Sequence, residues 1–127
     1  MDKKLKDSLS KIKLLICDID GVLTDGSFIK STSGEELRSF NALDGVGFVV
    51  LRLLDLNVKT AWITGRESLT TTQRAEELQI DDVYNGVIRK IDAYNELKKK
   101  YELSDSEVCF IGAVSYTHLT LPTRLPV

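Results

Sequence analysis

The sequence predicts an α/β fold in which helices cover both faces of a parallel sheet. Residues 13–19, 58–63 and 107–111 form short apolar segments with the composition of buried parallel strands. Between them lie segments with apolar residues at helical spacing, as expected for helices that connect one parallel strand to the next. Ligands bind such sheets at the carboxyl ends of the strands, so the polar residues found there are the candidates for a functional site.

The first expected strand is followed by two short segments, at residues 24–30 and 36–40. They flank a polar loop that contains Gly34, a pattern typical of a β-hairpin. We therefore expect a small hairpin insertion between the first strand and the first connecting helix.

Three amphipathic helices are expected, over residues 45–56, 67–78 and 90–101. Asn57 is a plausible stop for the first of them. A short strand at residues 83–84 should lie between the other two, before an Asn-Gly turn. The polar run Ser104-Asp105-Ser106-Glu107 should cap a short turn before the third apolar strand.

Composition indicates one globular domain and excludes several classes of function. The 127 residues are 43% hydrophobic and 28% charged, with a formal net charge of −2. No basic excess is present to bind nucleic acid or an anionic membrane surface. The N-terminus does not resemble a secretory signal, and the most apolar stretch is too short to cross a bilayer, so we expect a cytoplasmic protein. Cys17 and Cys109 lie within apolar segments and are expected to be buried and reduced.

Residues 113–127 differ in character from the rest of the chain. They show neither helical nor strand periodicity and include no acidic residue. Residues 114–123 can be back-translated, in frame, into the transposon adapter used to prepare sequencing libraries. We therefore expect a domain over residues 1–112, incomplete at its C-terminus, followed by a non-native tail. The lone histidine, His118, lies in this tail and is given no role.

Asp18 and Asp20 carry the main functional signal. They stand one residue apart where the first apolar segment ends, and Gly21 follows them. Buried charges are costly unless they are paired or bind a metal, so packing does not explain the pair. If the strand continued regularly, both carboxylates would lie on one face, where one could bind a cation and attack an electrophile while the other transferred a proton. The simpler alternative is an acidic loop that faces water.

Thr64, Gly65 and Lys90 add to this pattern. Thr64 and Gly65 follow the second strand, where a hydroxyl and an N–H can donate hydrogen bonds to phosphate oxygens. Thr64 could also cap the following helix. Lys90 lies at the start of a helix, where a cation is poorly placed for the helix dipole. That placement makes sense if Lys90 neutralises a phosphate, whereas the alternative is an exposed surface lysine.

These residues together resemble the haloacid dehalogenase superfamily. Residues 18–26 (DIDGVLTDG), residues 64–66 (TGR) and Lys90 look like its first three motifs. The segment 34–45, with its Gly-Glu-Glu-Leu and Asp-Gly pairs, is similar to the 3-deoxy-D-manno-octulosonate 8-phosphate phosphatases within that superfamily. The resemblance covers residues 14–112 and implies a Rossmann-like parallel sheet with flanking helices and a hairpin insertion.

The resemblance implies Mg²⁺-dependent hydrolysis of a sugar-acid phosphate monoester through an aspartyl-phosphate. Asp18 would be the nucleophile, and Asp20 would protonate the leaving sugar oxygen and then activate water. Mg²⁺ would be held by the Asp18 carboxylate, the Asp20 backbone carbonyl and a carboxylate after the third strand. Thr64, Gly65 and Lys90 would bind the phosphate.

Further positions match the substrate-binding residues of these phosphatases. The set is Asp20, Asn41, Ala42, Leu43, Asp44, Gly45, Arg66, Arg74 and Lys90. Arg66 and Arg74 could grip the carboxylate of a sugar acid, because a guanidinium group binds carboxylates in a fork. Arg74 could equally belong to a solvated helix face near Glu77.

The sequence also departs from the resemblance. Leu43 and Val49 stand where these phosphatases often have arginine, and Arg52 could substitute for one of them. The acids expected directly after the third strand's glycine, Gly112, are absent. We therefore expect the 127-residue polypeptide to lack a metal ligand, a further strand and the closing helix, and to be nearly or wholly inactive.

The expected partner is a small-molecule sugar phosphate. We expect the protein to bind neither nucleic acid nor a membrane. The hairpin is too small to cover the site, so a neighbouring subunit should close it, and the resemblance implies a homotetramer. Alternative functions are an acylneuraminate 9-phosphate phosphatase, a general sugar phosphatase, or a phosphatase-like domain linked to an acidic-sugar cytidylyltransferase. A phospho-receiver domain is the alternative from a different class, although its acceptor should follow a middle strand.

Overall fold

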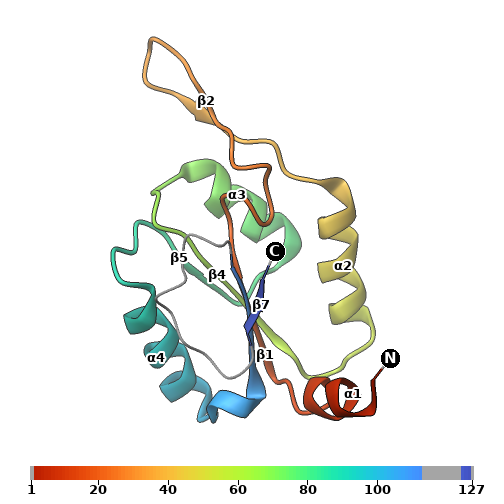
Figure 1. Cartoon of the computed structure of the whole chain (residues 1–127). Helices are drawn as coiled ribbons and strands as arrows, with labels where there is room; N and C mark the ends of the chain where they lie inside the picture. Colours follow the sequence, from red (N-terminus) through yellow and green to blue (C-terminus); the bar gives the residue numbers. More distant parts are fainter. Residues whose placement is uncertain (1, 113–123, 127) are drawn as a thin grey trace.

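The computed structural model describes residues 2–112 and 124–126, and the expected α/β architecture is confirmed (Figure 1). A parallel sheet is flanked by helices, and a small antiparallel hairpin projects from it. The elements in chain order are α1 (Lys3–Leu9), β1 (Leu14–Asp18), β2 (Ile29–Lys30), β3 (Glu36–Leu37), α2 (Ala42–Leu53), β4 (Lys59–Ile63), α3 (Leu69–Leu78), β5 (Asp82–Tyr84), α4 (Lys90–Tyr101), a 3₁₀ turn (Asp105–Glu107), β6 (Val108–Gly112) and β7 (Arg124–Pro126).

The first strand in the chain, β1, lies at the centre of the sheet. The strand order is β5-β4-β1-β6-β7, and every neighbouring pair is parallel. Within this sheet Ile16 of β1 is paired with Ala61 of β4 on one side and with Phe110 of β6 on the other. The chain runs outward from β1 in one direction through β4 and β5, and in the other through β6. The carboxyl end of β1 therefore lies where the order of the strands reverses, which is where such sheets bind ligands.

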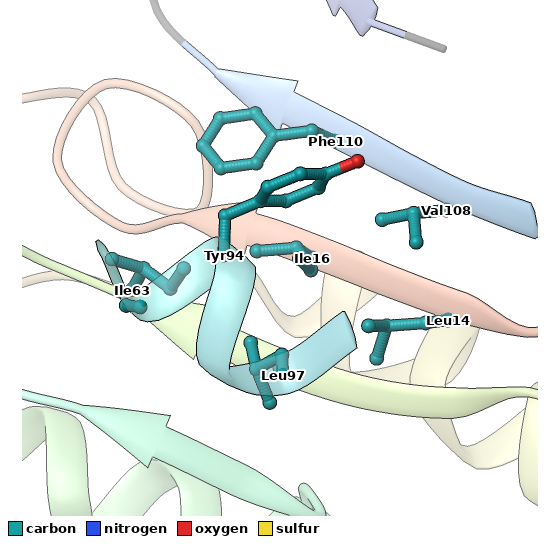
Figure 2. Packing of buried hydrophobic residues seen from close by; sticks show 9 residues of the cluster. Leu14, Ile16, Ile63, Tyr94, Leu97, Val108 and Phe110 are labelled. Atoms are coloured by element: carbon teal, nitrogen blue, oxygen red, sulfur yellow. The ribbon is translucent and has the colours of Figure 1, made fainter. Parts of the chain in front are cut away.

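One face of the sheet packs against α4, and Figure 2 shows the residues that meet there. Alternate residues of a strand point to the same face, so Leu14 and Ile16 of β1 both pack against α4. Tyr94 and Leu97 of α4 are buried among them, and Phe110 of β6 completes this cluster. Asp18 follows in the same alternation, which directs it toward the start of α4.

The opposite face of the sheet packs against α2 and α3. Cys17 and Ile19 of the β1 segment belong to this second cluster, with Trp62 of β4. Phe48 of α2 and Leu78 of α3 cover them. Both faces of β1 are therefore buried, which explains why its sequence is a continuous apolar run and not an alternating one.

The predicted hairpin is present, but its strands are shorter than the segments at 24–30 and 36–40. Only Ile29–Lys30 and Glu36–Leu37 pair, and Ile29 lies opposite Leu37. The hairpin extends away from the sheet beyond the carboxyl end of β1 (Figure 1). Its apolar residues Ile29 and Leu37 are 68% and 51% exposed. The short strands follow from this position, because the hairpin has no core of its own to pack against.

The start of α2 corrects one prediction. The helix was expected over residues 45–56, whereas it covers Ala42–Leu53. Asn41 is its N-cap, and the Asn41 side chain accepts a hydrogen bond of 2.8 Å from the backbone N–H of Leu43. Asparagine is among the strongest N-caps, so the helix begins where this cap is available.

The N-terminal helix and the tail add elements that were not predicted. Helix α1 contains no buried residue, so its sequence carries no core-facing periodicity. In the tail, Arg124–Pro126 forms β7, which pairs with Phe110–Gly112 of β6. The expectations for His118 and for the other residues of 113–123, and for residue 127, fall on residues outside those described. Among residues 2–112 and 124–126, no helix is both long and apolar enough to span a membrane.

The two cysteines are free and buried, as predicted. Burial raises the pKa of the Cys17 thiol to about 12, and burial also raises the pKa of Cys109. Only the thiolate reacts readily with disulfide reagents. We expect Cys17 in the folded protein to react with an aromatic disulfide on the order of 10³-fold more slowly than an unperturbed cysteine.

The measurement is the absorbance of the released aromatic thiol, with and without urea. Unfolding should restore the normal rate at both cysteines. Fast reaction of both thiols in native protein at neutral pH would contradict the buried positions.

Candidate active site

Asp18 is the last residue of β1, and its side chain is buried at the carboxyl edge of the sheet. The residue is 1% exposed, and this charged side chain lies on the same face of β1 as aliphatic residues. Its Oδ1 atom accepts a hydrogen bond of 2.9 Å from the backbone N–H of Ile19 and one of 2.7 Å from Nζ of Lys90. Its Oδ2 atom is buried and has no hydrogen-bond partner. Hydrogen bonds thus hold the Oδ1 atom in place, while the Oδ2 atom is available to bind a ligand.

Burial raises the pKa of Asp18 above its usual value, and the hydrogen bond and charge of Lys90 act in the opposite direction. Desolvation favours the neutral acid, whereas a nearby cation favours the carboxylate. Lys90, together with the backbone N–H of Ile19, therefore partly offsets the effect of burial on the Asp18 pKa.

Lys90 is the first residue of α4 and is only 6% exposed. Its burial confirms that it is not a surface lysine, which was the alternative interpretation from the sequence. It reaches Asp18 because Tyr94 and Leu97 anchor α4 to the face of the sheet on which Asp18 lies. A buried lysine is tolerated when a carboxylate pairs with it, and here the pair spans 72 positions of the chain.

The backbone turns sharply after Asp18, so the strand does not continue to Asp20. The carbonyl of Ile19 accepts hydrogen bonds from the N–H groups of Val22, Leu23 and Thr24. Gly21 has a φ of 83°, a conformation that favours glycine. Asp20 consequently points toward the hairpin and does not continue the face on which Asp18 lies.

Asp20 forms an ion pair with Arg38, a residue that the sequence reasoning did not select. Nε of Arg38 donates a hydrogen bond of 2.9 Å to Oδ1 of Asp20. The Arg38 side chain is completely buried, whereas that of Asp20 is 29% exposed. The sequence signal was weak: Glu36 and Arg38 are two apart at the end of the hairpin and therefore share a face. Nothing in the sequence shows that this face is turned toward Asp20.

Thr64 and Arg66 form the next part of the site, directly after β4. Thr64 is buried, and its hydroxyl lies 3.3 Å from the backbone nitrogen of Arg66, which donates to it. Thr64 does not cap the following helix, because α3 begins at Leu69 with Ser68 as its N-cap. Gly65 beside it is exposed. The Arg66 guanidinium reaches the hairpin, where Nη1 donates to Oε1 of Glu36 at 3.5 Å.

The predicted residues Asn41 to Gly45 and Arg74 form a separate group between α2 and α3. Nη2 of Arg74 lies 2.6 Å from the position that a Cβ atom would occupy at Gly45, so a side chain there would displace the end of the Arg74 side chain. Nη1 of Arg74 donates to Glu77 at 3.0 Å, which agrees with the alternative interpretation of a helix-face pair. Within the described residues, no hydrogen bond or ion pair links this group to Asp18 or Asp20.

Within this group of predicted substrate-binding residues, Ala42 and Leu43 lie in the first turn of α2 and are exposed. Arg52, which was considered as a substitute for a missing arginine, does not lie at the site. Its Nη1 atom donates to the backbone carbonyl of Leu78, at the C-terminal end of α3. That contact is near the amino end of β4, at the opposite edge of the sheet.

A cavity of about 310 Å³ connects the turn after β1 with the start of α2. Its lining includes Thr24 and Asp25 from the turn and Asn41 and Asp44 from the helix start. The cavity has room for a small polar molecule, and its walls come from two of the segments that the sequence singled out.

The described residues supply only part of a metal site. No group of three or more histidine, cysteine, aspartate or glutamate side chains in the described ranges is arranged to hold a metal ion. The free Oδ2 atom of Asp18 is nevertheless the type of ligand that a hard cation takes. Mg²⁺ commonly uses one or two carboxylates together with waters and substrate phosphate, so this arrangement fits Mg²⁺.

The geometry supports a nucleophile, an electrostatic partner and a proton-transfer group. A buried carboxylate with one free oxygen can attack an electrophile, and the Lys90 ammonium beside it can neutralise an oxyanion. Asp20 is partly accessible and can exchange a proton with a bound molecule or water.

Comparison with known proteins finds relatives that are named 3-deoxy-D-manno-octulosonate 8-phosphate phosphatases. No protein-family model matches the chain. The 3-deoxy-D-manno-octulosonate 8-phosphate phosphatase KdsC of Yersinia pestis is 41% identical over 103 residues, which cover 81% of this chain and 54% of that protein. The chain thus spans about half the length of the curated relatives it matches.

Solved structures show the same fold. One is a 3-deoxy-D-manno-octulosonate 8-phosphate phosphatase from Moraxella catarrhalis in complex with magnesium ion, phosphate ion and KDO; its TM-score is 0.83 at 33% identity, over 89% of this chain and 64% of that chain. Another is a putative HAD superfamily (subfamily III A) hydrolase from Legionella pneumophila, with a TM-score of 0.83 at 37% identity, over 91% of this chain and 63% of that chain.

Proposed function

This chain belongs to the haloacid dehalogenase superfamily, and we propose that the protein containing it hydrolyses a sugar-acid phosphate monoester with the help of Mg²⁺. The favoured substrate is 3-deoxy-D-manno-octulosonate 8-phosphate, the compound for which its relatives are named. The observation that carries the proposal is the state of Asp18: a buried carboxylate with one oxygen bound to Lys90 and the other without a partner.

Asp18 is the proposed nucleophile. One oxygen of its carboxylate attacks phosphorus, a new O–P bond forms, and the bond from phosphorus to the sugar oxygen breaks. Lys90 holds Oδ1 and so orients the attacking oxygen. Its positive charge also reduces the repulsion between two anions, the carboxylate and the phosphate, as they approach.

Asp20 is the proposed general acid and base. In the first step its proton passes to the leaving sugar oxygen, which departs as an alcohol. In the second step Asp20 takes a proton from water, and the water oxygen attacks phosphorus. The O–P bond to Asp18 then breaks, inorganic phosphate leaves, and both aspartates return to their starting states.

Mg²⁺ would be held by the Asp18 carboxylate and the backbone carbonyl of Asp20. When bound, it supplies positive charge that draws the phosphate toward the carboxylate and stabilises charge on the phosphoryl oxygens. A third protein ligand would come from the acids expected after Gly112. Thr64 and Gly65 are proposed to donate hydrogen bonds to the same phosphoryl oxygens.

The sugar part of the substrate is assigned to the arginines and to the start of α2. Arg66 is proposed to bind the carboxylate of the sugar. Its side chain is 42% exposed, and it reaches from the turn at Thr64 to the hairpin. Arg74 and the segment 41–45 are proposed to contact the substrate of a neighbouring subunit, since no hydrogen bond or ion pair among the described residues joins them to Asp18.

This assignment requires a homo-oligomer, and we propose a tetramer. The hairpin residues Ile29 and Leu37 and the α2 residues Leu43 and Val46 are exposed apolar side chains. Such clusters on a protein surface commonly mark subunit contacts. Both surfaces flank the site, so a second copy bound there would help to close it.

A substrate panel tests the proposed function. The chain, extended to the full length of its relatives, should release phosphate from sugar-acid phosphates when Mg²⁺ is present. We expect kcat/KM about 10- to 100-fold higher than for the same sugar phosphate without its carboxylate, since hydrogen bonds to a charged group contribute about 1.5–3 kcal/mol.

Three outcomes separate the alternatives. Equal rates on acidic and neutral sugars would favour a general sugar phosphatase. A stable acyl-phosphate formed from a small phosphodonor, without turnover, would favour a phospho-receiver domain. The absence of both hydrolysis and phosphorylation would refute the proposal.

A further inference from the structure

The Arg38 guanidinium, which lies between the hairpin and the turn after β1, has an unusual environment. Arg38 directly follows β3, and its side chain is 0% exposed. Its Nε atom donates to Oδ1 of Asp20 at 2.9 Å. The contact joins residues 18 positions apart, so the hairpin fold itself creates it.

Most of the donors on this guanidinium are unsatisfied. A guanidinium has five N–H groups, and four of them are on the two Nη atoms. Both Nη1 and Nη2 of Arg38 are buried and lack a hydrogen-bond partner. Nη2 lies 3.9 Å from Oε2 of Glu36, which is an ion pair at a distance too long for a hydrogen bond.

Stability alone does not explain such a residue. A buried donor without a partner costs free energy, and a buried ion pair contributes little even when its hydrogen bonds are complete. An apolar side chain at this position would bury the same surface without either cost. Groups of this kind in a native protein call for a functional explanation, and here the one completed bond goes to the proposed acid and base.

We propose that Arg38 is a positioning residue for Asp20 in the proposed phosphatase reaction. By binding Oδ1 from a fixed, buried position, Arg38 limits rotation of the carboxylate. The Oδ2 atom of Asp20 is then held toward the bound substrate, where it gives its proton to the leaving oxygen and later takes one from water. The inference rests on the proposed function, because it assumes that Asp20 transfers these protons.

The hairpin provides the fixed position. Glu36 of β3 contacts both Arg38 and Arg66, at 3.9 and 3.5 Å. The Arg66 guanidinium also lies 4.0 Å from the ring centroid of Phe28, just before β2. These contacts join the hairpin both to the turn after β1 and to the turn after β4. They restrict the movement of the hairpin segment that carries Arg38.

The test is the dependence of the Arg38→Gln variant on the leaving group. A sugar alkoxide needs a proton to leave, whereas the nitrophenolate of p-nitrophenyl phosphate does not. Because general acid catalysis contributes about 10²- to 10⁴-fold, we expect kcat on the sugar phosphate to fall about 30- to 100-fold. The rate at which p-nitrophenyl phosphate phosphorylates Asp18, measured as a nitrophenol burst, should fall less than about threefold.

Other measurements distinguish positioning from a structural role. KM for the sugar phosphate should not rise, and phosphorylated Asp18 formed from p-nitrophenyl phosphate should accumulate, because the water step also needs Asp20. Arg38→Lys should restore part of kcat, since an ammonium can pair with Asp20 but lacks the fork geometry. Arg89→Gln is the matched control: this arginine is largely exposed and pairs with Asp92.

Several results would overturn the inference. One is a loss in the nitrophenol burst rate as large as the loss in kcat on the sugar phosphate, and another is a rise in KM with kcat unchanged. Unchanged kinetics would also overturn it. Circular dichroism should show that the variants are folded. If Arg38→Gln does not fold, Arg38→Lys is used to compare kcat on the sugar phosphate with the nitrophenol burst. An unmodified full-length protein that neither hydrolyses phosphate nor becomes phosphorylated would refute the proposed function itself, before any question about Arg38.

Discussion

Asp18→Asn should abolish phosphate release from a sugar phosphate by the full-length protein. The amide keeps the size of the carboxylate but cannot act as the nucleophile, and removing a nucleophile can cost factors of 10⁴ or more in kcat. The variant should still fold, because the amide oxygen can accept the bonds that Lys90 and the Ile19 N–H give to Oδ1. The measurements are phosphate release and the mass of the protein after rapid quenching with acid.

Asp7→Asn is the matched control, since Asp7 lies exposed on α1. The control should keep full activity and should form the same phosphorylated species as the unmodified protein. If Asp18→Asn released phosphate at an undiminished rate, Asp18 would not be the nucleophile, and the role of the buried oxygen would need another explanation.

Lys90→Met should lower both activity and stability. Loss of one preorganised electrostatic group typically reduces kcat by about 10²- to 10³-fold. The Asp18 carboxylate would also lose the partner that offsets its burial, and breaking a buried pair costs about 3–5 kcal/mol. Phosphate release measures the first effect, and urea unfolding monitored by circular dichroism measures the second.

Lys99→Met, on the same helix, provides the comparison. Lys99 is exposed, so its replacement should change neither quantity by much. The double variant Asp18→Asn with Lys90→Met should be less destabilised than the sum of the two single variants, because the two residues are in contact. Additive losses of stability would indicate that the pair does not act as a unit.

The sheet was predictable from sequence because its strands are buried on both faces. β1 and β6 are apolar up to their last residues, Asp18 and Gly112, whereas β4 begins with Lys59 and Thr60, is apolar over Ala61–Ile63 and is followed by Thr64. The helices were less predictable. On α2 the exposed residues Val46, Val50 and Leu53 share the spacing expected of a core face, whereas Gly45 and Phe48 are the residues actually buried. Periodicity alone could not distinguish a face that packs on the sheet from an apolar face left outside.

The residues of the site that lie at strand ends could be predicted from the sequence. Its contacts between distant segments of the chain could not. Asp18, Thr64 and Lys90 follow from strand alternation and from their places at element boundaries. Arg38 meets Asp20 only because a hairpin folds back over the turn, and no local pattern encodes that approach. Arg74 was predicted from the resemblance, yet its guanidinium pairs with Glu77 and lies beside Gly45.

The central place of β1 affects when the surroundings of Asp18 are assembled. β1 is the first strand to be synthesised, but one of its two neighbours, β6, follows only after nearly all of the described chain. Contacts between such distant segments form slowly, because a long loop must close before they stabilise anything. Lys90 also arrives late, with α4. The buried environment of Asp18 is thus complete only near the end of folding, and a nascent chain that stops before α4 would carry Asp18 without the lysine that pairs with it.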